Sequence, residues 1–582
     1  MDFIKVGSAC PKTKVADVIF NVENICSCID DAYNKDVKFL VFPELSITSY
    51  TCADLFLTST LINKSIEGIK LVCENSINKD MLIAVGCPLI HNNVLYNTAF
   101  IIFEGKILGI VPKSYIPNYS EFYEKRWFTA AAMLTDELVA LPFQENIPFG
   151  TNLIFAAGDY KFGIEICEDL WVTIPPSSYL SLLGANIIGN LSASNELVSK
   201  KDYRLSLIAN QSARCMSSYI YSSAGVHEST TDLLFSGHLV ISENGTILKE
   251  NNRFQRENEV ITSCIDVFKL NAERLKNLSY RDSSKIVPFK PKNINFNFKN
   301  TKINNFDRYI DKHPFVPSNE HEREERCKEI FNIQSSALAK RLEHTNLKKA
   351  VIGISGGLDS TLALLVIVKT FKLLGIDNSN IITITMPGFG TTDRTYNNAL
   401  TLCRELNTDL REINIVEASL QHFKDIGHDK NIHDVTYENV QARERTQILM
   451  DLANKEGGLL IGTGDLSELA LGWCTYNGDH MSMYAVNPSI PKTLVRYLVK
   501  YVAEKESTKE VAHTLLDILD TPVSPELLPK GEKGDIVQKT EDIVGPYELH
   551  DFFIYHMIRF SDEPKKLLRK TKLAFKDKYD DE

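Results

Sequence analysis

Apolar and polar residues alternate in short runs through the first half of the chain, and this period of two predicts β-strands. The runs occupy residues 37–45, 81–90, 96–113, 160–170, 184–194, 218–225 and 235–250. Within the third run, Glu104 and Gly105 separate two apolar segments and predict a hairpin turn. Hairpins of this kind favour a mixed sheet with antiparallel edges. We therefore expect an α+β or layered architecture up to about residue 265.

The second half has a different rhythm, in which apolar strands alternate with helical segments. Strands are predicted at residues 350–355, 381–388, 410–415 and 459–464, and helices at 361–375, around 395–406 and at 438–457. Regular alternation of strand and helix is typical of a parallel, doubly wound sheet. The predicted fold class is thus α/β with two domains.

Length and local composition indicate where the domains end. A chain of 582 residues is too long for one ordinary core. Between about residues 270 and 325, Asn, Lys and Pro are frequent and periodic apolar residues are few, which is typical of a linker. An amphipathic helix is predicted from Glu322 onward. We expect a first domain at 1–268, a linker at 269–321 and a second domain at 322–582.

Charge and cysteine usage exclude several classes of protein. The net charge is −11, from 64 basic and 75 acidic residues, which argues against a general nucleic-acid binder. Twelve cysteines are scattered with no Cys-x-x-Cys pair, so we expect neither a disulfide framework nor a structural zinc site, and a reducing, cytoplasmic location. The N-terminus lacks the pattern of a secretory signal, and the longest apolar run, 362–368, is too short to span a membrane.

A glycine-rich loop opens the second domain between a buried strand and a helix. It contains Ser355, Gly356, Gly357, Asp359 and Ser360. Glycines let the backbone approach a ligand, and amides at a helix start attract phosphate, although a tight strand-to-helix turn favours the same residues. The loop fits neither the Walker nor the dinucleotide pattern. It resembles the pyrophosphate loop of ATP pyrophosphatases, which cleave ATP between its α and β phosphates and adenylate a substrate.

Further motifs in the second domain make this resemblance more specific. Residues 386–399, 437–450, 462–492 and 538–553 occur in the order expected of NAD synthetases, and the likeness runs from about residue 313 to 560. The resemblance implies a ligase that adenylates the nicotinate carboxylate of deamido-NAD with ATP, releasing pyrophosphate. Ammonia then displaces AMP and forms the amide.

The resemblance also implies roles for individual residues. The loop from Ser355 to Ser360 and Thr463 would bind ATP, a co-substrate, while Asp359 and Glu468 would help to hold Mg²⁺. Deamido-NAD would contact Asn439, Arg443, Glu468, Trp473, Tyr476, Asp479, Lys492 and Lys539. Asn439 and Arg443 are four residues apart and so share one helix face.

Three strands of the first domain are expected to end at residues with complementary chemistry. Glu44, Lys113 and Cys167 each follow an apolar strand. If the three ends converge, Glu44 can take the thiol proton, Cys167 can attack an amide carbon, and Lys113 can stabilise the resulting oxyanion. A small buried hydrophobe is the plainer interpretation of Cys167, since the adjacent Glu168 and Asp169 would raise the thiol pKa.

These three residues and their surroundings resemble the nitrilase superfamily, in particular the glutaminase domain of glutamine-dependent NAD synthetases. The likeness covers roughly residues 1–265 and implies a four-layer αββα sandwich that forms homo-oligomers. By this resemblance, glutamine would contact Tyr50, Tyr119, Phe122, Ser194 and Lys200. Ser49 stands where a glycine often precedes the tyrosine in the family.

Two other interpretations account for part of the sequence. Pyrophosphate loops also serve GMP synthesis, asparagine synthesis and tRNA thiolation, but these enzymes usually have other amidotransferase domains or paired cysteines. A binding or scaffold protein with decayed sites is disfavoured because Glu44, Lys113, Cys167 and the whole phosphate loop are intact. We expect an enzyme whose partners are glutamine, ATP and deamido-NAD, with no nucleic acid and no membrane.

Overall fold

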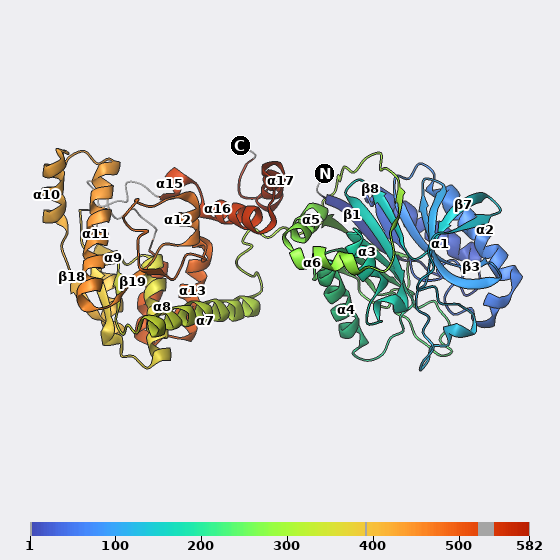
Figure 1. Cartoon of the computed structure of the whole chain (residues 1–582), viewed down its shortest axis with the longest axis horizontal. Helices are drawn as coiled ribbons and strands as arrows, with labels where there is room; N and C mark the ends of the chain where they lie inside the picture. Colours follow the sequence, from blue (N-terminus) through green and yellow to red (C-terminus); the bar gives the residue numbers. More distant parts are fainter. Residues whose placement is uncertain (1–2, 390–392, 522–539, 581–582) are drawn as a thin grey trace. The chain divides into compact units, whose positions relative to one another are not determined.

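The computed structural model describes residues 3–389, 393–521 and 540–580. The chain divides into two compact units, Met1–Tyr309 and Ile310–Glu582 (Figure 1). Lys539, one of the expected substrate contacts, lies outside the described residues.

The first unit contains two sheets. The eight-stranded sheet has the order β14-β1-β2-β3-β4-β5-β7-β6. Its strands are β14 (Glu259–Asp266), β1 (Phe3–Cys10), β2 (Phe39–Val41), β3 (Leu82–His91), β4 (Val94–Phe103), β5 (Lys106–Pro112), β7 (Gln144–Phe149) and β6 (Glu137–Leu141). The β4–β5 hairpin turns at Glu104 and Gly105, which have φ values of 44° and 84°, so the predicted hairpin is confirmed.

The seven-stranded sheet of this unit has the order β13-β12-β11-β10-β9-β8-β15. Its strands are β13 (Thr246–Glu250), β12 (Leu239–Glu243), β11 (Ser218–Ser223), β10 (Ile187–Ser192), β9 (Tyr160–Ile166), β8 (Leu153–Ala157) and β15 (Lys292–Asn295). Strand β9 pairs in parallel with β10 and antiparallel with β8, so this sheet is mixed, as expected.

Helices cover the outer face of each sheet. Side chains of α1 (Val18–Asn34) and α2 (Ser59–Ser76) form one core with the eight-stranded sheet, and those of α3 (Pro176–Leu182) and α4 (Lys200–Arg214) form another with the seven-stranded sheet. A third core, which includes Val41, Phe162 and Ile164, lies between the sheets. The expected four-layer αββα sandwich is confirmed.

The segment expected to be a linker, 269–321, begins with regular structure, and its residues up to Tyr309 belong to the first unit, whereas 310–321 belong to the second. It forms α5 (Val267–Lys276), α6 (Leu278–Ser283) and η4 (Ser284–Ile286), and then strand β15, which pairs in parallel with β8. After β15, the rings of Phe296 and Phe298 pack against Phe103 and Phe162 of the inter-sheet core. Apolar side chains too few to show a period in the sequence therefore close one part of the sandwich.

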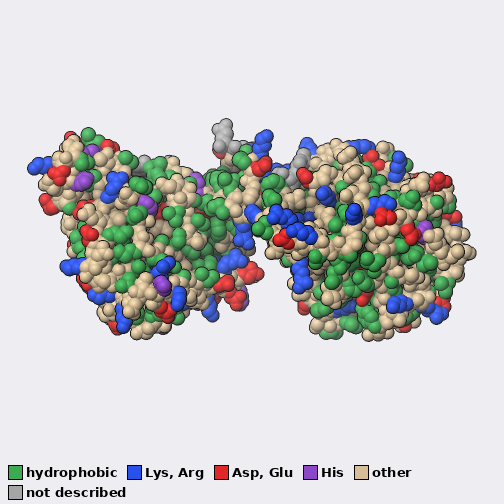
Figure 2. Space-filling view, in the orientation of Figure 1, with side chains coloured by type: hydrophobic (Ala, Val, Ile, Leu, Met, Phe, Trp, Pro, Cys, Tyr) green, Lys and Arg blue, Asp and Glu red, His purple; other side chains and the backbone are tan. Residues whose placement is uncertain are grey.

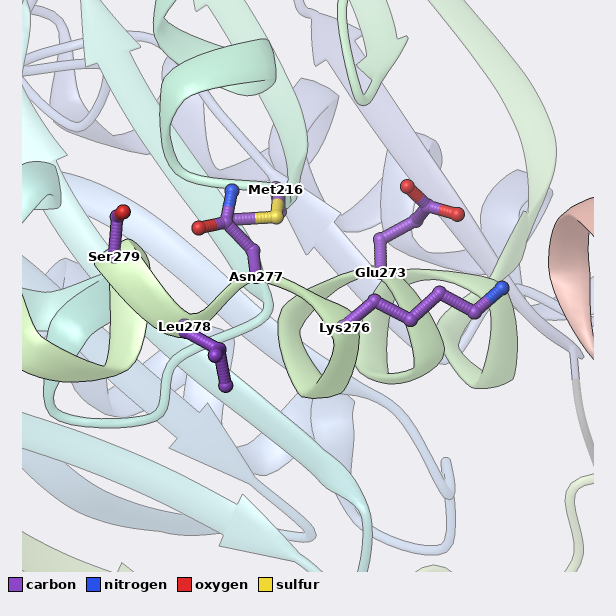
Figure 3. Close-up of a pocket in the computed structure, with 6 residues that line it drawn as sticks. All are labelled: Met216, Glu273, Lys276, Asn277, Leu278 and Ser279. Carbon is purple, nitrogen blue, oxygen red and sulfur yellow. The ribbon is translucent and has the colours of Figure 1, made fainter.

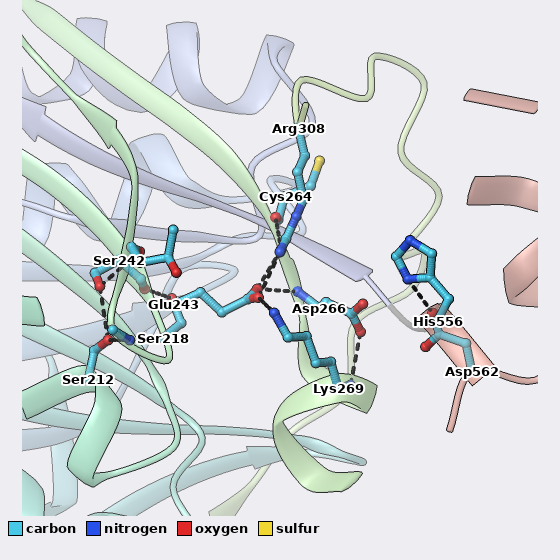
Figure 4. A network of polar contacts seen from close by, with 12 residues as sticks. Ser212, Ser218, Ser242, Glu243, Cys264, Asp266, Lys269, Arg308, His556 and Asp562 are labelled. Atoms are coloured by element: carbon cyan, nitrogen blue, oxygen red, sulfur yellow. Dashed lines mark hydrogen bonds and ion pairs between the residues drawn. The ribbon is translucent and has the colours of Figure 1, made fainter. Parts of the chain in front are cut away.

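Ion pairs attach the end of this segment to the edge of the first unit. The guanidinium of Arg308 donates to both carboxylate oxygens of the buried Glu243, at 2.5 and 2.8 Å (Figure 4). The same carboxylate accepts the backbone N–H of Asp266 at 2.8 Å, and Lys269 Nζ lies 3.5 Å from it. One residue earlier, Asp307 pairs with Lys5 at 3.1 Å.

The second unit is built on a five-stranded sheet of order β18-β17-β16-β19-β20, in which every neighbouring pair is parallel. The strands are β18 (Asp409–Glu412), β17 (Ile381–Thr385), β16 (Ala350–Gly353), β19 (Leu459–Gly462) and β20 (Tyr484–Ala485). Side chains of α7 (Glu320–Thr345), α8 (Leu358–Leu374), α9 (Asp393–Glu405), α13 (Lys492–Lys505) and α14 (Lys509–Leu519) share one core with the sheet. The helix predicted from Glu322 is α7, and the parallel, doubly wound sheet is confirmed.

Helix α11 (Val435–Glu456) contributes to a separate core with strands β16, β17 and β19. The remaining helices of this unit are α10 (Val416–Ile426), α12 (Leu466–Leu471), α15 (Thr540–Val544), α16 (Tyr547–Ile554) and α17 (Pro564–Ala574). Shorter turns are η1 (Ala53–Leu57), η2 (Glu124–Arg126) and η3 (Cys167–Leu170) in the first unit, and η5 (Asn378–Asn380) and the π-turn η6 (Tyr555–Arg559) in the second.

Figure 2 shows basic and acidic side chains interspersed over the visible face of each unit. Among the described residues, no helix has both the length and the apolar character needed to cross a bilayer.

Phe296→Ala tests whether the segment after β15 is part of the first unit's core. Phe296 is 9 % exposed, and its removal leaves a cavity beside Phe103, so we expect the first unit to lose about 3 kcal/mol of stability. Urea dependence of amide hydrogen exchange in β8 and β9 reports on this unit alone. Ile286→Ala, at a side chain 78 % exposed, is the control and should change little. Unchanged exchange in Phe296→Ala would contradict the interpretation.

Candidate active sites

Three strand ends of the first unit meet around Cys167. Glu44 lies three residues after β2, Lys113 directly follows β5, and Cys167 directly follows β9. The turn containing Glu44 passes so close to Gly86 of β3 that a Cβ there would lie 2.2 Å from the backbone nitrogen of Leu45, which only glycine permits. The side chains of Glu44 and Lys113 are fully buried, and Cys167 is 6 % exposed. The predicted convergence is therefore present.

A second carboxylate completes this cluster. Lys113 Nζ donates to Glu44 Oε1 at 2.6 Å and to both oxygens of Glu124 at 2.9 Å. Asn97 Nδ2 also donates to Glu44 Oε1 at 2.6 Å, whereas Glu44 Oε2 is buried with no hydrogen-bond partner among the described residues. Glu124 gives no signal in the sequence because it lies in an irregular stretch, on the short turn η2, where no periodicity marks it.

Burial and charge set the ionisation of the cluster. Burial would lower the pKa of Lys113, but the carboxylates of Glu124 and Glu44 raise that pKa well above its ordinary value, so Lys113 stays an ammonium. Burial raises the pKa of Glu44 to about 7, despite the opposing effect of Lys113. Burial, reinforced by the charge of Glu44, also raises the pKa of Cys167 well above its ordinary value. A resting thiol beside a carboxyl group that ionises near neutrality is suited to proton transfer on attack.

The acidic neighbours of Cys167 point to other partners. Asp169 accepts the backbone N–H groups of Ile166 at 2.9 Å and Tyr115 at 2.9 Å, and so ties the turn of Cys167 to the segment after Lys113. Glu168 accepts the hydroxyl of Tyr119 at 3.0 Å. Cys167 itself has a φ of 46°, in the left-handed region, as expected of a residue held at a sharp strand-to-helix turn.

The residues expected to contact glutamine are held by contacts within the first unit. The buried Tyr50 donates its hydroxyl to Glu124 Oε1 at 2.7 Å. Lys200 Nζ donates to Asn195 Oδ1 and lies 5.8 Å from the ring centre of Phe122. Burial lowers the pKa of Lys200. Ser194, also buried, accepts Arg204 Nη2 at 3.4 Å.

In the second unit, the phosphate loop has the geometry that the sequence predicts. Gly357 is the N-cap residue of α8 and has no side chain to bond the helix start, where backbone N–H groups favour an anion. Ser355 Oγ accepts the N–H of Gly357 at 3.2 Å. Gly356 has a φ of 85°, and a Cβ there would lie 2.2 Å from the carbonyl oxygen of Thr395. The loop can thus pass close to its neighbour only with glycine at this position.

Next to the loop, one lysine lies among three carboxylates. Lys492 Nζ lies 2.8 Å from Asp359, 2.7 Å from Asp465 and 2.8 Å from Glu468. Burial raises the pKa of Asp465 to about 7 and also raises the pKa of Glu468. Asp465 was not predicted as a site residue; its role as the N-cap of α12, where it accepts the N–H of Glu468, conceals it in the sequence. We call Asp359, Asp465 and Glu468 the acidic cluster, and the expected substrate contact Lys492 lies within it.

The donor set of this acidic cluster fits a hard divalent cation. Carboxylate oxygens of Asp359, Asp465 and Glu468 lie within 4.8 Å of one another. Asp359 Oδ1 is buried and has no hydrogen-bond partner among the described residues. Mg²⁺ prefers oxygen ligands, and a buried carboxylate oxygen without a partner is available to such a cation. The predicted pair Asp359 and Glu468 are together, with Asp465 as a third candidate ligand.

Hydrogen bonds also fix Thr463, Asn439 and Arg443, three other expected contacts. Asn487, buried, donates to the carbonyl oxygens of Asp359 at 3.0 Å and Thr463 at 3.2 Å, and so joins the phosphate loop to the end of β19. Asn439 accepts the hydroxyl of Thr475 at 2.7 Å, and Arg443 donates to the carbonyl oxygen of Tyr476 at 3.0 Å.

Asn439 and Arg443, which both lie on α11, thus contact the loop that follows α12. In that loop, Trp473 is 38 % and Tyr476 75 % exposed, and Asp479 accepts the N–H of Thr475 at 2.7 Å. The two aromatic rings are therefore open to a ligand.

A surface hollow elsewhere on the first unit involves none of these residues. It is lined by residues of α5, of α6, of the junction between them and of the turn between α4 and β11: Met216, Glu273, Lys276, Asn277, Leu278 and Ser279 (Figure 3).

Comparison with known proteins assigns both units. Residues 5–272 match the family model described as carbon-nitrogen hydrolase, and residues 330–525 match that of NAD synthase. The glutamine-dependent NAD(+) synthetase of Mycobacterium leprae is 37 % identical over 593 residues, which cover 99 % of this chain and 86 % of that protein. This chain belongs to the glutamine-dependent NAD(+) synthetase family.

More distant relatives have the same name. The glutamine-dependent NAD(+) synthetase of Aquifex aeolicus is 26 % identical over 566 residues, which cover 96 % of this chain and 89 % of that protein. A solved glutamine-dependent NAD(+) synthetase from Cytophaga hutchinsonii is 22 % identical, with a TM-score of 0.41 and coverage of 100 % of this chain and 90 % of that chain.

The raised pKa of Glu44 predicts a pH dependence of the family's glutaminase reaction. Only the ionised carboxylate can accept the thiol proton, so kcat/KM for glutamine should fall as the pH drops through about 7. Initial rates of glutamate release across pH 5.5–8.5 test this. A kcat/KM that stays constant down to pH 5.5, as the ordinary pKa of a glutamate near 4.3 requires, would contradict the proposed environment.

Lys492→Met tests the balance of charge in the acidic cluster. Lys492 is 12 % exposed at its side chain, and its removal leaves three carboxylates facing one another, so the second unit should lose about 3 kcal/mol of stability. Millimolar Mg²⁺ should restore part of this loss, as measured by thermal unfolding with Mg²⁺ or with chelator. Stability unaffected by Mg²⁺ in the variant would remove these carboxylates as a cation site.

Proposed function

We propose that this chain makes NAD(+) from deamido-NAD, ATP and the amide nitrogen of glutamine. The observation that carries the proposal is the pairing, in one member of this family, of a buried Cys167–Glu44–Lys113 cluster with a glycine-rich phosphate loop beside an acidic cluster. One site generates ammonia, and the other consumes it.

In the first unit, Cys167 is the nucleophile. Glu44 takes the thiol proton as the sulfur forms a bond to the amide carbon of glutamine. The ammonium of Lys113, held by Glu124, lies beside Glu44 and stabilises the negative charge on the amide oxygen. The protonated Glu44 then gives its proton to the departing nitrogen, ammonia leaves, and a thioester remains. Water, deprotonated by Glu44, cleaves the thioester and releases glutamate.

Two side chains near the thiol carry charges that match an α-amino acid. Glu168 is half-buried and can accept an α-ammonium group, and Lys200 can pair with an α-carboxylate. Tyr50, Tyr119 and Phe122 would contact the methylene chain between these groups and the amide. This combination favours glutamine over a neutral amide of similar length.

In the second unit, backbone amides at the start of α8 receive ATP phosphates, and Thr463 lies close to the loop through Asn487. Asp359, Asp465 and Glu468 would hold Mg²⁺, which when bound neutralises phosphate charge as the carboxylate of deamido-NAD approaches. Lys492 contributes a fixed positive charge at the same place.

The loop after α12 and the facing side of α11 would bind deamido-NAD. Trp473 and Tyr476 offer exposed aromatic faces for stacking on its rings. Asn439 and Arg443 support this loop through Thr475 and Tyr476, and Asp479 is a further polar contact of the loop. Lys539 is proposed as an additional contact on the strength of the family resemblance.

A reducing, cytoplasmic location is part of the proposal. All twelve cysteines are free, including the nucleophile, which must remain a thiol to react. Association into a homo-oligomer stays a prediction from the family resemblance.

Cys167→Ala separates the two reactions. The substitution deletes the sulfur but little volume, so the protein should fold, make NAD(+) from ammonium at a rate close to that of wild type, and fail with glutamine. Coupled assays of NAD(+) formation with each nitrogen source measure both routes. A thiol-directed glutamine analogue should label wild type at Cys167 and block the glutamine route only.

Two results would reject the assignment. If Cys167→Ala still makes NAD(+) from glutamine, Cys167 is not the nucleophile. If wild type forms no NAD(+) from either nitrogen source, the proposed function is rejected and a scaffold protein is favoured.

A further inference from the structure

Helix α13, which begins with Lys492, has no cap of its own. Its N-cap residue is Pro491, and no side chain there bonds to the helix. The first backbone N–H groups of a helix have no partner within it, so they need partners from elsewhere when the helix start is buried. The start of α13 is important because its first residue, Lys492, carries the ammonium at the centre of the acidic cluster.

Those partners come from two other helices. Asp551 of α16, 1 % exposed, accepts the N–H of Thr493 at 2.9 Å and the hydroxyl of the same residue at 2.6 Å. Its other carboxylate oxygen accepts the hydroxyl of Ser467, from α12. Ser467 Oγ in turn accepts the N–H of Lys492 at 2.9 Å. The first turn of α13 is therefore capped in trans by a carboxylate and a hydroxyl.

On both α12 and α13, the residue that contacts Asp551 is adjacent in sequence to a residue that lies in the acidic cluster. Ser467 is next to Glu468, and Thr493 is next to Lys492, while Glu468 and Lys492 are 2.8 Å apart at their charged atoms. A single buried carboxylate thus fixes the starts of α12 and α13 relative to each other. Negative charge at a helix start is also favoured by the helix dipole, which strengthens the contact with α13.

Helix α16 reaches Lys492 from a second position. The ring of Tyr547 lies 5.4 Å from Lys492 Nζ, within the range of a cation–π contact. Asp551 and Tyr547 are four residues apart and so lie on the same face of α16. This face of α16 is consequently directed at the residues that surround the proposed adenylation site.

Resting on the proposed function, we propose that Asp551 is a positioning residue for adenylation. It contacts none of the oxygens of the acidic cluster, and it acts through Ser467 and Thr493 on Glu468 and Lys492. Misplacement of catalytic groups by about 1 Å can lower a rate on the order of 100-fold. Loss of Asp551 should therefore reduce turnover in the second unit far more than it reduces binding of deamido-NAD.

The test compares Asp551→Ala, Asp551→Asn and Ser467→Ala with the wild-type full-length chain. Each protein is assayed for ammonium-dependent NAD(+) formation, the Mg²⁺ concentration for half-maximal rate, glutaminase activity and thermal unfolding. Thr508→Ala is the matched control, since Thr508 caps the adjacent helix α14 by accepting the N–H of Val511 at 3.4 Å.

We expect Asp551→Ala to lower kcat with ammonium about 100-fold and to raise the Mg²⁺ requirement, with KM for deamido-NAD within about threefold of wild type. Asp551→Asn, which keeps one acceptor oxygen, should fall between wild type and Asp551→Ala. Ser467→Ala should reproduce part of the loss if Asp551→Ala fails to fold. Glutaminase activity, which belongs to the first unit, should not change in any variant.

Two outcomes would overturn the proposal. A folded Asp551→Ala or Ser467→Ala with kcat and Mg²⁺ requirement within twofold of wild type would show that the contact is dispensable. An equal loss of kcat in Thr508→Ala would show that the loss comes from a general decrease in helix stability and not from the contact of Asp551. Because wild type is assayed with ammonium alongside, absence of any NAD(+) synthesis would reject the proposed function itself and is distinguishable from both.

Discussion

The ammonium of Lys113, buried and shared by Glu44 and Glu124, is the interaction on which the chemistry of the first unit depends. Two carboxylates cannot be buried together without a compensating charge, and a buried ammonium needs the same compensation. With one positive charge for two carboxyl groups, one of them can hold a proton near neutrality. Glu44, with a pKa of about 7, has this property, and it lies beside the nucleophile.

The sandwich makes this cluster possible because its strands deliver the three groups from separate places in the sequence. Strand ends of β2 and β5 come from one sheet, and the end of β9 comes from the other. The close backbone approach at Gly86 and the positive φ of Cys167 are locally unfavourable conformations. The surrounding core and the hydrogen bonds to Asp169 stabilise them. In the second unit, three carboxylates surround the ammonium of Lys492, and the same carboxylates are candidate ligands of a cation.

Sequence patterns predicted the residues that follow regular strands and missed those that lie on turns. Glu44, Lys113 and Cys167 could be found because each ends an apolar run, and the loop at Gly356 because it joins a strand to a helix. Glu124 on a short turn and Asp465 at a helix cap carry no periodic signal. Asp551 acts across three helices, and such a contact depends on tertiary packing alone.

The linker was the least predictable part of the fold. Its composition is that of a connecting segment, yet β15 pairs with β8, and Phe296 and Phe298 pack on the inter-sheet core. Two aromatic side chains and a four-residue strand are too few to produce a periodic pattern, although they bury enough surface to order the segment.

The most direct test of the central claim is NAD(+) formation by Lys113→Met with glutamine and with ammonium. The substitution keeps bulk and removes the charge shared by Glu44 and Glu124. The account predicts a fall of about 100- to 1000-fold in the glutamine route and a rate within about twofold of wild type with ammonium. A folded variant that retains the glutamine route would contradict it.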